Sequence, residues 1–235
     1  MRLDKYLCDL NIGSRSRVKQ FISQGLVSVN DAIVKQCDFK IDENNDNIFF
    51  QGKQLGYQKY YYFMLNKPQG VVSATKDNKD KTVLDLLSKE DFRNDLFPVG
   101  RLDKDTEGLL LLTNNGSLAH ELLSPRKHVD KTYQVILESA LSPEAAKRLE
   151  EGVDIGETEP TLPAKVKFIE NDRILLTIHE GRFHQVKRML QAVGNKVIGL
   201  KRLSFGNLCL DEKLAPGAYR ILTEREVELL HGRHS

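Results

Sequence analysis

Several hydrophobic runs in the middle of this chain follow one another with no helical segment between them. Residues 164–169 and 173–178 are two such runs, and only three residues separate them. This pattern favours an α+β fold with a mixed, largely antiparallel sheet and flanking helices, because a doubly wound sheet would place a helix after each strand. We expect strands at 61–66, 108–113, 132–137, 164–169 and 173–178, and helices at 82–88, 117–123, 143–150, 182–193 and 223–230.

The N-terminal region has a different pattern. Four apolar residues from Leu3 to Leu10 recur at helical spacing, Gly13 is expected to end that helix in the left-handed conformation, and Ser14 to cap a second helix. Short strands are predicted at 26–29, 32–34 and 47–50, followed by a linker over 52–60 that contains two glycines. The chain therefore divides into a small α/β module over residues 1–58 and a larger domain over 59–235.

Composition excludes several classes of protein. The chain has 235 residues, of which 40% are hydrophobic and 29% charged, as in ordinary globular proteins. No apolar run approaches the ~18 residues of a membrane span, and the first residues do not resemble a signal peptide. The three cysteines (Cys8, Cys37 and Cys209) form no CxxC pair. We expect a reduced, cytoplasmic protein with no membrane partner and no metal site.

The net charge of +2 at first argues against a nucleic-acid partner, but the charge is unevenly distributed. Residues 1–40 contain seven basic and four acidic residues, a local net charge of +3. Residues 181–202 contain six basic residues and no acid, a local +6. These two basic segments predict two surfaces that contact RNA phosphates, unless they are ordinary solvated faces.

Residues 2 to about 45 include RLDKYL and GSRSRVKQFISQGLVSVN. This pattern resembles the small RNA-binding module of ribosomal protein S-four, whose two helices present basic side chains to folded RNA. The resemblance implies six RNA contacts, namely Arg2, Lys5, Ser14, Arg15, Arg17 and Lys19. The alternative is a charged helical hairpin that only faces solvent.

The run GRLDKDTEGLLLLTNNG over residues 100–116 places a charged loop before a strongly apolar strand. It resembles the central motif of the RsuA family of pseudouridine synthases, and the resemblance covers about residues 1–232. It implies that Asp103 is the catalytic carboxylate and that Arg101 helps to displace the target nucleotide. Read without the family, Asp103 could be an ordinary loop aspartate.

Two further blocks match the same family, KTY at 131–133 and EGRFHQVKRML at 180–190. The resemblance implies that Tyr133 stacks on the target base and that Lys187 is the counter-ion of Asp103, with Arg182 and Arg188 as nearby alternatives. It also implies that Ile198, or failing that Leu200, lines the uracil pocket. Without the family, Tyr133 would be expected in the core.

The resemblance as a whole implies an enzyme that needs no cofactor and isomerises a uridine of small-subunit ribosomal RNA. The expected partner is that RNA, within an assembling small subunit, and the expected state is a monomer. Three alternatives stay open: a relative that acts on large-subunit RNA, a non-catalytic RNA-binding assembly factor, and a glycoside hydrolase that uses Asp103 and Asp105.

Overall fold

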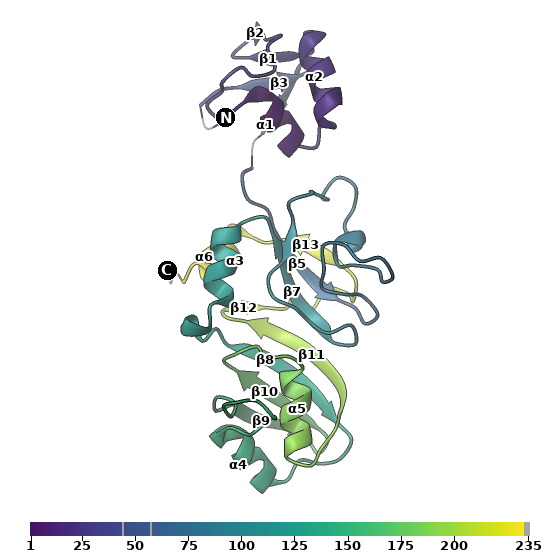
Figure 1. Cartoon of the computed structure of the whole chain (residues 1–235), viewed down its shortest axis with the longest axis vertical. Coiled ribbons are helices and arrows are strands. Elements are labelled where there is room, and N and C mark those ends of the chain that lie inside the picture. The colour runs from purple at the N-terminus through teal and green to yellow at the C-terminus, as the bar shows by residue number, and fades with distance from the viewer. Residues whose placement is uncertain (44, 57, 233–235) are drawn as a thin grey trace. The chain divides into compact units, whose positions relative to one another are not determined.

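The computed structural model describes residues 1–43, 45–56 and 58–232. Contacts divide the chain into two compact units, drawn in Figure 1. The first consists of residues 1–59 with 88–94, and the second of residues 60–87 with 95–235. Tyr57, inside the predicted linker, and residues 44 and 233–235, inside the two predicted domains, lie outside the described residues.

The first unit packs two helices against a four-stranded sheet of order β2-β1-β3-β4. Its elements are α1 (Leu3–Asp9), α2 (Arg15–Ser23), β1 (Val27–Val29), β2 (Ala32–Ile33), β3 (Ile48–Phe50) and β4 (Lys53–Leu55). The predicted helices and the first three strands are confirmed. The prediction of a linker from residue 52 is wrong, because Lys53–Leu55 pairs antiparallel with β3.

The turn between α1 and α2 also differs in detail from the prediction. The left-handed residue is Asn11, with φ 56°, and Gly13 has no positive φ. Asparagine tolerates this conformation better than most residues, so it can replace glycine at a helix end. Ser14 caps α2 as predicted, because its side chain accepts a hydrogen bond of 3.4 Å from the Arg17 amide.

The second unit is built on a nine-stranded sheet whose main path is β13-β5-β7-β11-β8-β10-β9, with β12 on β11 and β6 on β7. The strands are β5 (Tyr62–Lys67), β6 (Phe97–Pro98), β7 (Glu107–Thr113), β8 (Lys131–Leu137), β9 (Lys165–Glu170), β10 (Arg173–Ile178), β11 (Val197–Phe205), β12 (Leu208–Cys209) and β13 (Tyr219–Ile221). The pairing of β7 with β11 is parallel and the other pairings in this sheet are antiparallel. The predicted mixed, largely antiparallel sheet is therefore confirmed.

Side chains alternate between two hydrophobic cores along the central strands. In β7, Leu110 and Leu112 enter one core and Leu109 and Leu111 the other. The first core includes side chains of α4 (Pro143–Glu151) and α5 (Gln185–Ala192), and the second includes those of α3 (Gly116–Leu123) and α6 (Glu224–Leu230). Figure 1 shows α3 and α6 together, apart from α4 and α5. The sheet is thus covered on both faces, which explains the unbroken leucine run.

Three predicted helices of this unit are confirmed as α3, α4 and α6. The helix predicted over 82–88 is wrong, because only a 3-10 turn forms over Leu84–Leu86. The helix predicted over 182–193 begins later, at Gln185, after His184 takes a left-handed conformation with φ 50°. A second 3-10 turn spans Pro125–Lys127. None of the helices in the described part of the chain has the length and apolarity that crossing a bilayer requires.

Candidate active site

A cavity of about 570 Å³ lies within the second unit. The loop before β7 supplies Asp103 to its wall, strands β8 and β11 supply Tyr133 and Leu200, and the turn before α5 supplies His184. This volume is in the range of pockets that hold small molecules. The cavity can therefore accept one nucleoside but not a double helix.

The loop that holds Asp103 is fixed through its backbone. The Lys67 side chain, which is 0% exposed, donates hydrogen bonds of 2.9 Å and 2.8 Å to the main-chain oxygens of Asp103 and Thr106. Ser73 Oγ accepts from the Leu102 amide at 3.0 Å and donates to the Leu102 oxygen at 2.8 Å. These bonds hold the backbone on both sides of the aspartate, so its carboxylate has a defined position.

Sequence reasoning missed Lys67. The residue ends the apolar strand β5, and burial lowers the pKa of its ammonium group to about 8, although Asp103 and neighbouring acids raise it. A lysine at the end of a buried strand, directly before Pro68, was a usable signal. Lysine is rarely fully buried without partners, and here backbone oxygens are its partners.

The Asp103 carboxylate lies against two side chains from the α5 region. Lys187 Nζ is 2.9 Å from Asp103 Oδ2, and His184 Nε2 is 3.5 Å from Asp103 Oδ1. Lys187 Nζ also lies 2.7 Å from Asp105 Oδ1, a contact that was not expected. Burial lowers the pKa of Lys187, but hydrogen bonds to Asp105 and Asp103 outweigh that effect and raise it overall. The same bond holds the pKa of Asp105 below its usual value.

The other residues singled out in the sequence differ in their relation to the cavity. Tyr133 and Leu200 are buried in its wall, and Arg101, which is exposed, also lines it. Ile198 is 58% exposed and does not line the cavity. Of the two apolar candidates, Leu200 therefore has the position that a base-lining residue needs.

Two further cations line the cavity. Lys131 donates a 2.7 Å hydrogen bond to the Val129 oxygen, and burial together with the nearby charge of Arg202 lowers the pKa of Lys131 to about 8. Arg202 is 2% exposed, donates from Nε to the Leu109 oxygen, and leaves Nη2 without a hydrogen-bond partner. Neither cation has an ion-pair partner within the described ranges, so both leave this wall electropositive.

The fold and this cavity match known proteins. A family model described as RNA pseudouridylate synthase matches residues 61–192, and one described as S4 domain matches residues 1–47. The RNA pseudouridine synthase YtzG of Bacillus subtilis is 50% identical over 98% of this chain and 98% of its own length. Ribosomal small subunit pseudouridine synthase A of Escherichia coli is 43% identical over 97% of this chain and 98% of its own. A crystal structure of a pseudouridylate synthase matches with a TM-score of 0.70 and 40% identity over 98% of this chain and 99% of that chain.

This chain belongs to the RNA pseudouridine synthase family. The synthase combines an RNA-binding S4 domain with the fold of these enzymes. Membership argues against the alternatives of a glycoside hydrolase and a non-catalytic factor. In the described part of the synthase, no three His, Cys, Asp or Glu side chains converge as metal ligands would.

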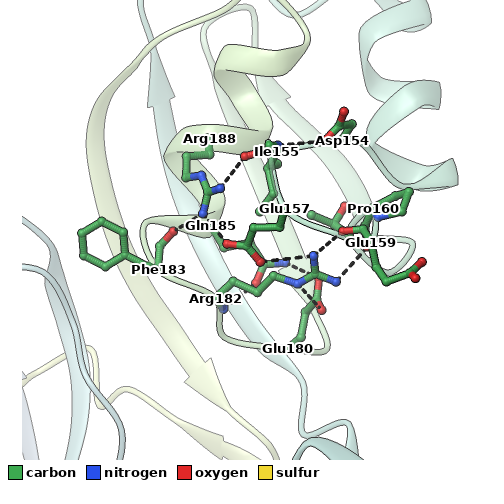
Figure 2. Close-up of polar contacts among 12 residues, drawn as sticks. Asp154, Ile155, Glu157, Glu159, Pro160, Glu180, Arg182, Phe183, Gln185 and Arg188 are labelled. Carbon is green, nitrogen blue, oxygen red and sulfur yellow. Dashed lines mark hydrogen bonds and ion pairs between the residues drawn. The ribbon is translucent and has the colours of Figure 1, made fainter.

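The segment 181–202 of the synthase carries less free positive charge than its sequence suggests, because acids pair with most of its cations. Arg182 bonds to Glu180 at 2.9 Å, and Arg188 bonds to Glu157 at 2.5 Å, as Figure 2 shows. Lys187 is engaged by Asp103 and Asp105, Lys196 lies 3.4 Å from Glu138, and Arg202 is buried. Except for Glu180, which is two residues from Arg182, these acids lie 25 or more residues away along the chain, so the sequence did not show them as partners.

The basic helix α2 of the first unit keeps more free charge. Arg2 is paired with Asp4 at 2.7 Å, and Lys5 with Asp9 at 2.6 Å. By contrast, three cations of α2 have exposed side chains and no ion pair within the described residues: Arg15, Arg17 and Lys19. Ser14 uses its hydroxyl oxygen as the helix cap. The charges of these three α2 cations are therefore not neutralised by an acid in the described part of the chain.

Proposed function

We propose that this synthase converts one uridine of small-subunit ribosomal RNA to pseudouridine, with Asp103 as the reacting carboxylate. The observation that supports this role best is the fixed position of Asp103 on the wall of a nucleoside-sized cavity, with Lys187 at 2.9 Å. The Escherichia coli relative named for small-subunit activity matches nearly end to end, which supports the choice of RNA.

The reaction needs no oxidant and no loss of atoms. The N1–C1′ bond of the uridine breaks, the uracil turns, a C5–C1′ bond forms, C5 loses a proton and N1 gains one. The target base must leave its stack to reach Asp103, and an aromatic ring is the usual surface for an extruded base. Tyr133 has this role in the proposal, and Arg101, exposed at the cavity, assists the extrusion.

A carboxylate suits this chemistry because it can stabilise or covalently trap an electron-poor carbon, whether attack occurs at the sugar or at the base. The Lys187 ammonium balances its charge while the cavity is empty. Leu200 lines the uracil site. In this proposal, Lys131 and Arg202 stabilise the negative charge on the departing uracil.

Each unit has a separate task in this proposal. The catalytic domain, residues 59–235, holds the cavity, and the module of residues 1–58 binds RNA. Arg15, Arg17 and Lys19 make its main phosphate contacts, while Arg2, Lys5 and Ser14 are engaged within the module. Phosphate contacts of this kind position a protein without selecting a base.

The test is a map of pseudouridines in ribosomal RNA from cells with the gene, without it, and with variants restored. Loss of one small-subunit site, rescued by the wild type and not by Asp103→Asn, is the expected result. Asp105→Asn is the matched control, because it also removes a carboxylate from Lys187 but should still rescue. Rescue by Asp103→Asn would overturn the role of Asp103, and loss confined to the large subunit would overturn the substrate.

A further inference from the structure

The ring of Phe183 is the most exposed large apolar side chain of the described residues, at 71%, and it lies on the rim of the cavity. Its centroid is 3.8 Å from that of the His184 ring, with the planes 19° apart. One face of the Phe183 ring is therefore covered by His184 and the other is open. His184 in turn lies 3.5 Å from Asp103, so the stacked pair connects the open surface to the reacting carboxylate.

A polar network holds the turn that presents this ring. Arg188 donates to the Phe183 main-chain oxygen at 3.1 Å, while Glu157 accepts from the same guanidinium. Gln185 accepts from the Arg182 amide at 3.0 Å and donates to Glu180 at 2.7 Å. Figure 2 shows the Phe183 ring pointing away from this network.

The backbone at the turn would not keep its shape without such support. His184 has φ 50° and ψ 30°, a left-handed conformation that costs a non-glycine residue about 1 kcal/mol or more. The network therefore holds the backbone that carries Phe183, and the stack on His184 is the contact of the ring itself. The position of the ring at the cavity, and not its exposure alone, indicates a ligand.

We infer that Phe183 is a stacking site for the RNA base adjacent to the target uridine. The inference rests on the proposed function. The cavity accepts one nucleoside, so the neighbouring nucleotides must lie at its rim, where this ring stands. Bases of unpaired RNA commonly stack on aromatic side chains, and every base has a face that suits them. One exposed aromatic ring matches one base, whereas a protein partner would need a wider apolar patch.

The test uses the full chain with Asp103→Asn, so that no turnover occurs, and a single-stranded RNA of about 20 nucleotides around the mapped uridine. Phe183→Ala should weaken binding about tenfold, in line with the loss of one stacked base. Phe183→Trp should bind as well as the parent. Phe168→Ala is the matched control, because Phe168 is 49% exposed on β9 and does not line the cavity.

A second arm removes the base instead of the ring. The parent should bind RNA with an abasic ribose on one side of the uridine about tenfold more weakly than intact RNA. Phe183→Ala should bind the abasic and the intact RNA with equal affinity. Equal losses from the abasic ribose in both proteins, or unchanged affinity of Phe183→Ala, would overturn the stacking site while the proposed function stands. Failure of the parent to bind this RNA would overturn the proposed substrate and the stacking site with it.

Discussion

Lys67 Nζ lies 2.9 Å from the main-chain oxygen of Asp103, so the buried lysine holds the backbone of the aspartate and leaves its carboxylate free. The carboxylate instead faces Lys187 at the cavity. One lysine thus fixes the position of the loop and another balances the charge of the side chain. The two lysines should therefore respond differently to substitution.

Replacement of Lys67 by methionine should lower the stability of the protein. Methionine nearly fills the same volume but leaves the oxygens of Asp103, Thr106 and Pro68 without their donor. Unsatisfied buried polar groups cost about 1–3 kcal/mol each. Part of this cost is offset here, because the substitution also removes a buried charge. We expect a net loss of about 2–3 kcal/mol in the free energy of unfolding, measured in urea. An unchanged unfolding midpoint would show that the loop does not depend on this lysine.

The same pair of proteins should differ in how stability depends on pH. The pKa of Lys67 is lowered to about 8 in the folded state, so between pH 8 and 10.5 the unfolded chain binds more protons than the folded one. The contribution of Lys67 to the free energy of unfolding therefore rises with pH. The advantage of the wild type over Lys67→Met should grow by roughly 2 kcal/mol between pH 7.5 and 9.5. A constant or shrinking difference would contradict the lowered pKa.

Lys187 should affect the reaction more than the fold. Its ammonium group contacts Asp103 and Asp105 at the cavity, so its removal would leave both carboxylates without this cation and change the charge around Asp103 and the position of its side chain. Lys187→Gln should lower single-turnover conversion about 100-fold, measured as tritium release from RNA labelled at C5 of uridine. Lys187→Arg keeps the charge and should stay within about tenfold of the wild type. Similar losses in both variants would show that shape, not charge, matters here.

Gly108 should tolerate no side chain, because the parallel pairing of β7 with β11 brings it close to Arg202. A Cβ at this position would stand 2.3 Å from the Arg202 main-chain oxygen, at φ 103°. Gly108→Ala should therefore cost about 3 kcal/mol or more of stability, measured by thermal unfolding. Gly116→Ala is the control, since a Cβ there meets nothing within 4 Å, and it should be nearly neutral.

The sequence predicted five of the nine strands of the large unit, β5, β7, β8, β9 and β10, because their hydrophobic runs are long. It did not predict β11, because charged and apolar side chains are mixed along Val197–Phe205. The leucines of β7 fall into two cores, so their sequence shows no alternation that would reveal which face lines the cavity. Local pattern was sufficient for the strands with long hydrophobic runs but not for the way strands pair.

The sequence also predicted only part of the candidate site. The motifs led to Asp103, Tyr133 and Lys187, and the fold places all three on one cavity wall. Lys67 escaped notice because its partners are backbone oxygens, which leave no trace in a sequence. The pairing of Glu157 with Arg182 and Arg188 escaped notice because Glu157 lies more than 20 residues before them. Charge counts along a segment cannot show which acids fold against it.

The salt dependence of RNA binding should separate free cations from engaged ones. Arg15 is exposed on α2 without an ion pair among the described residues, whereas Arg188 is held by Glu157 and by the Phe183 oxygen. Each phosphate contact contributes about one unit to the slope of log affinity against log salt concentration. Arg15→Gln should therefore lower that slope by about one, and Arg188→Gln should leave it unchanged while weakening binding through the loosened turn. A lower slope for Arg188→Gln would mean that Arg188 leaves Glu157 to meet a phosphate when RNA binds.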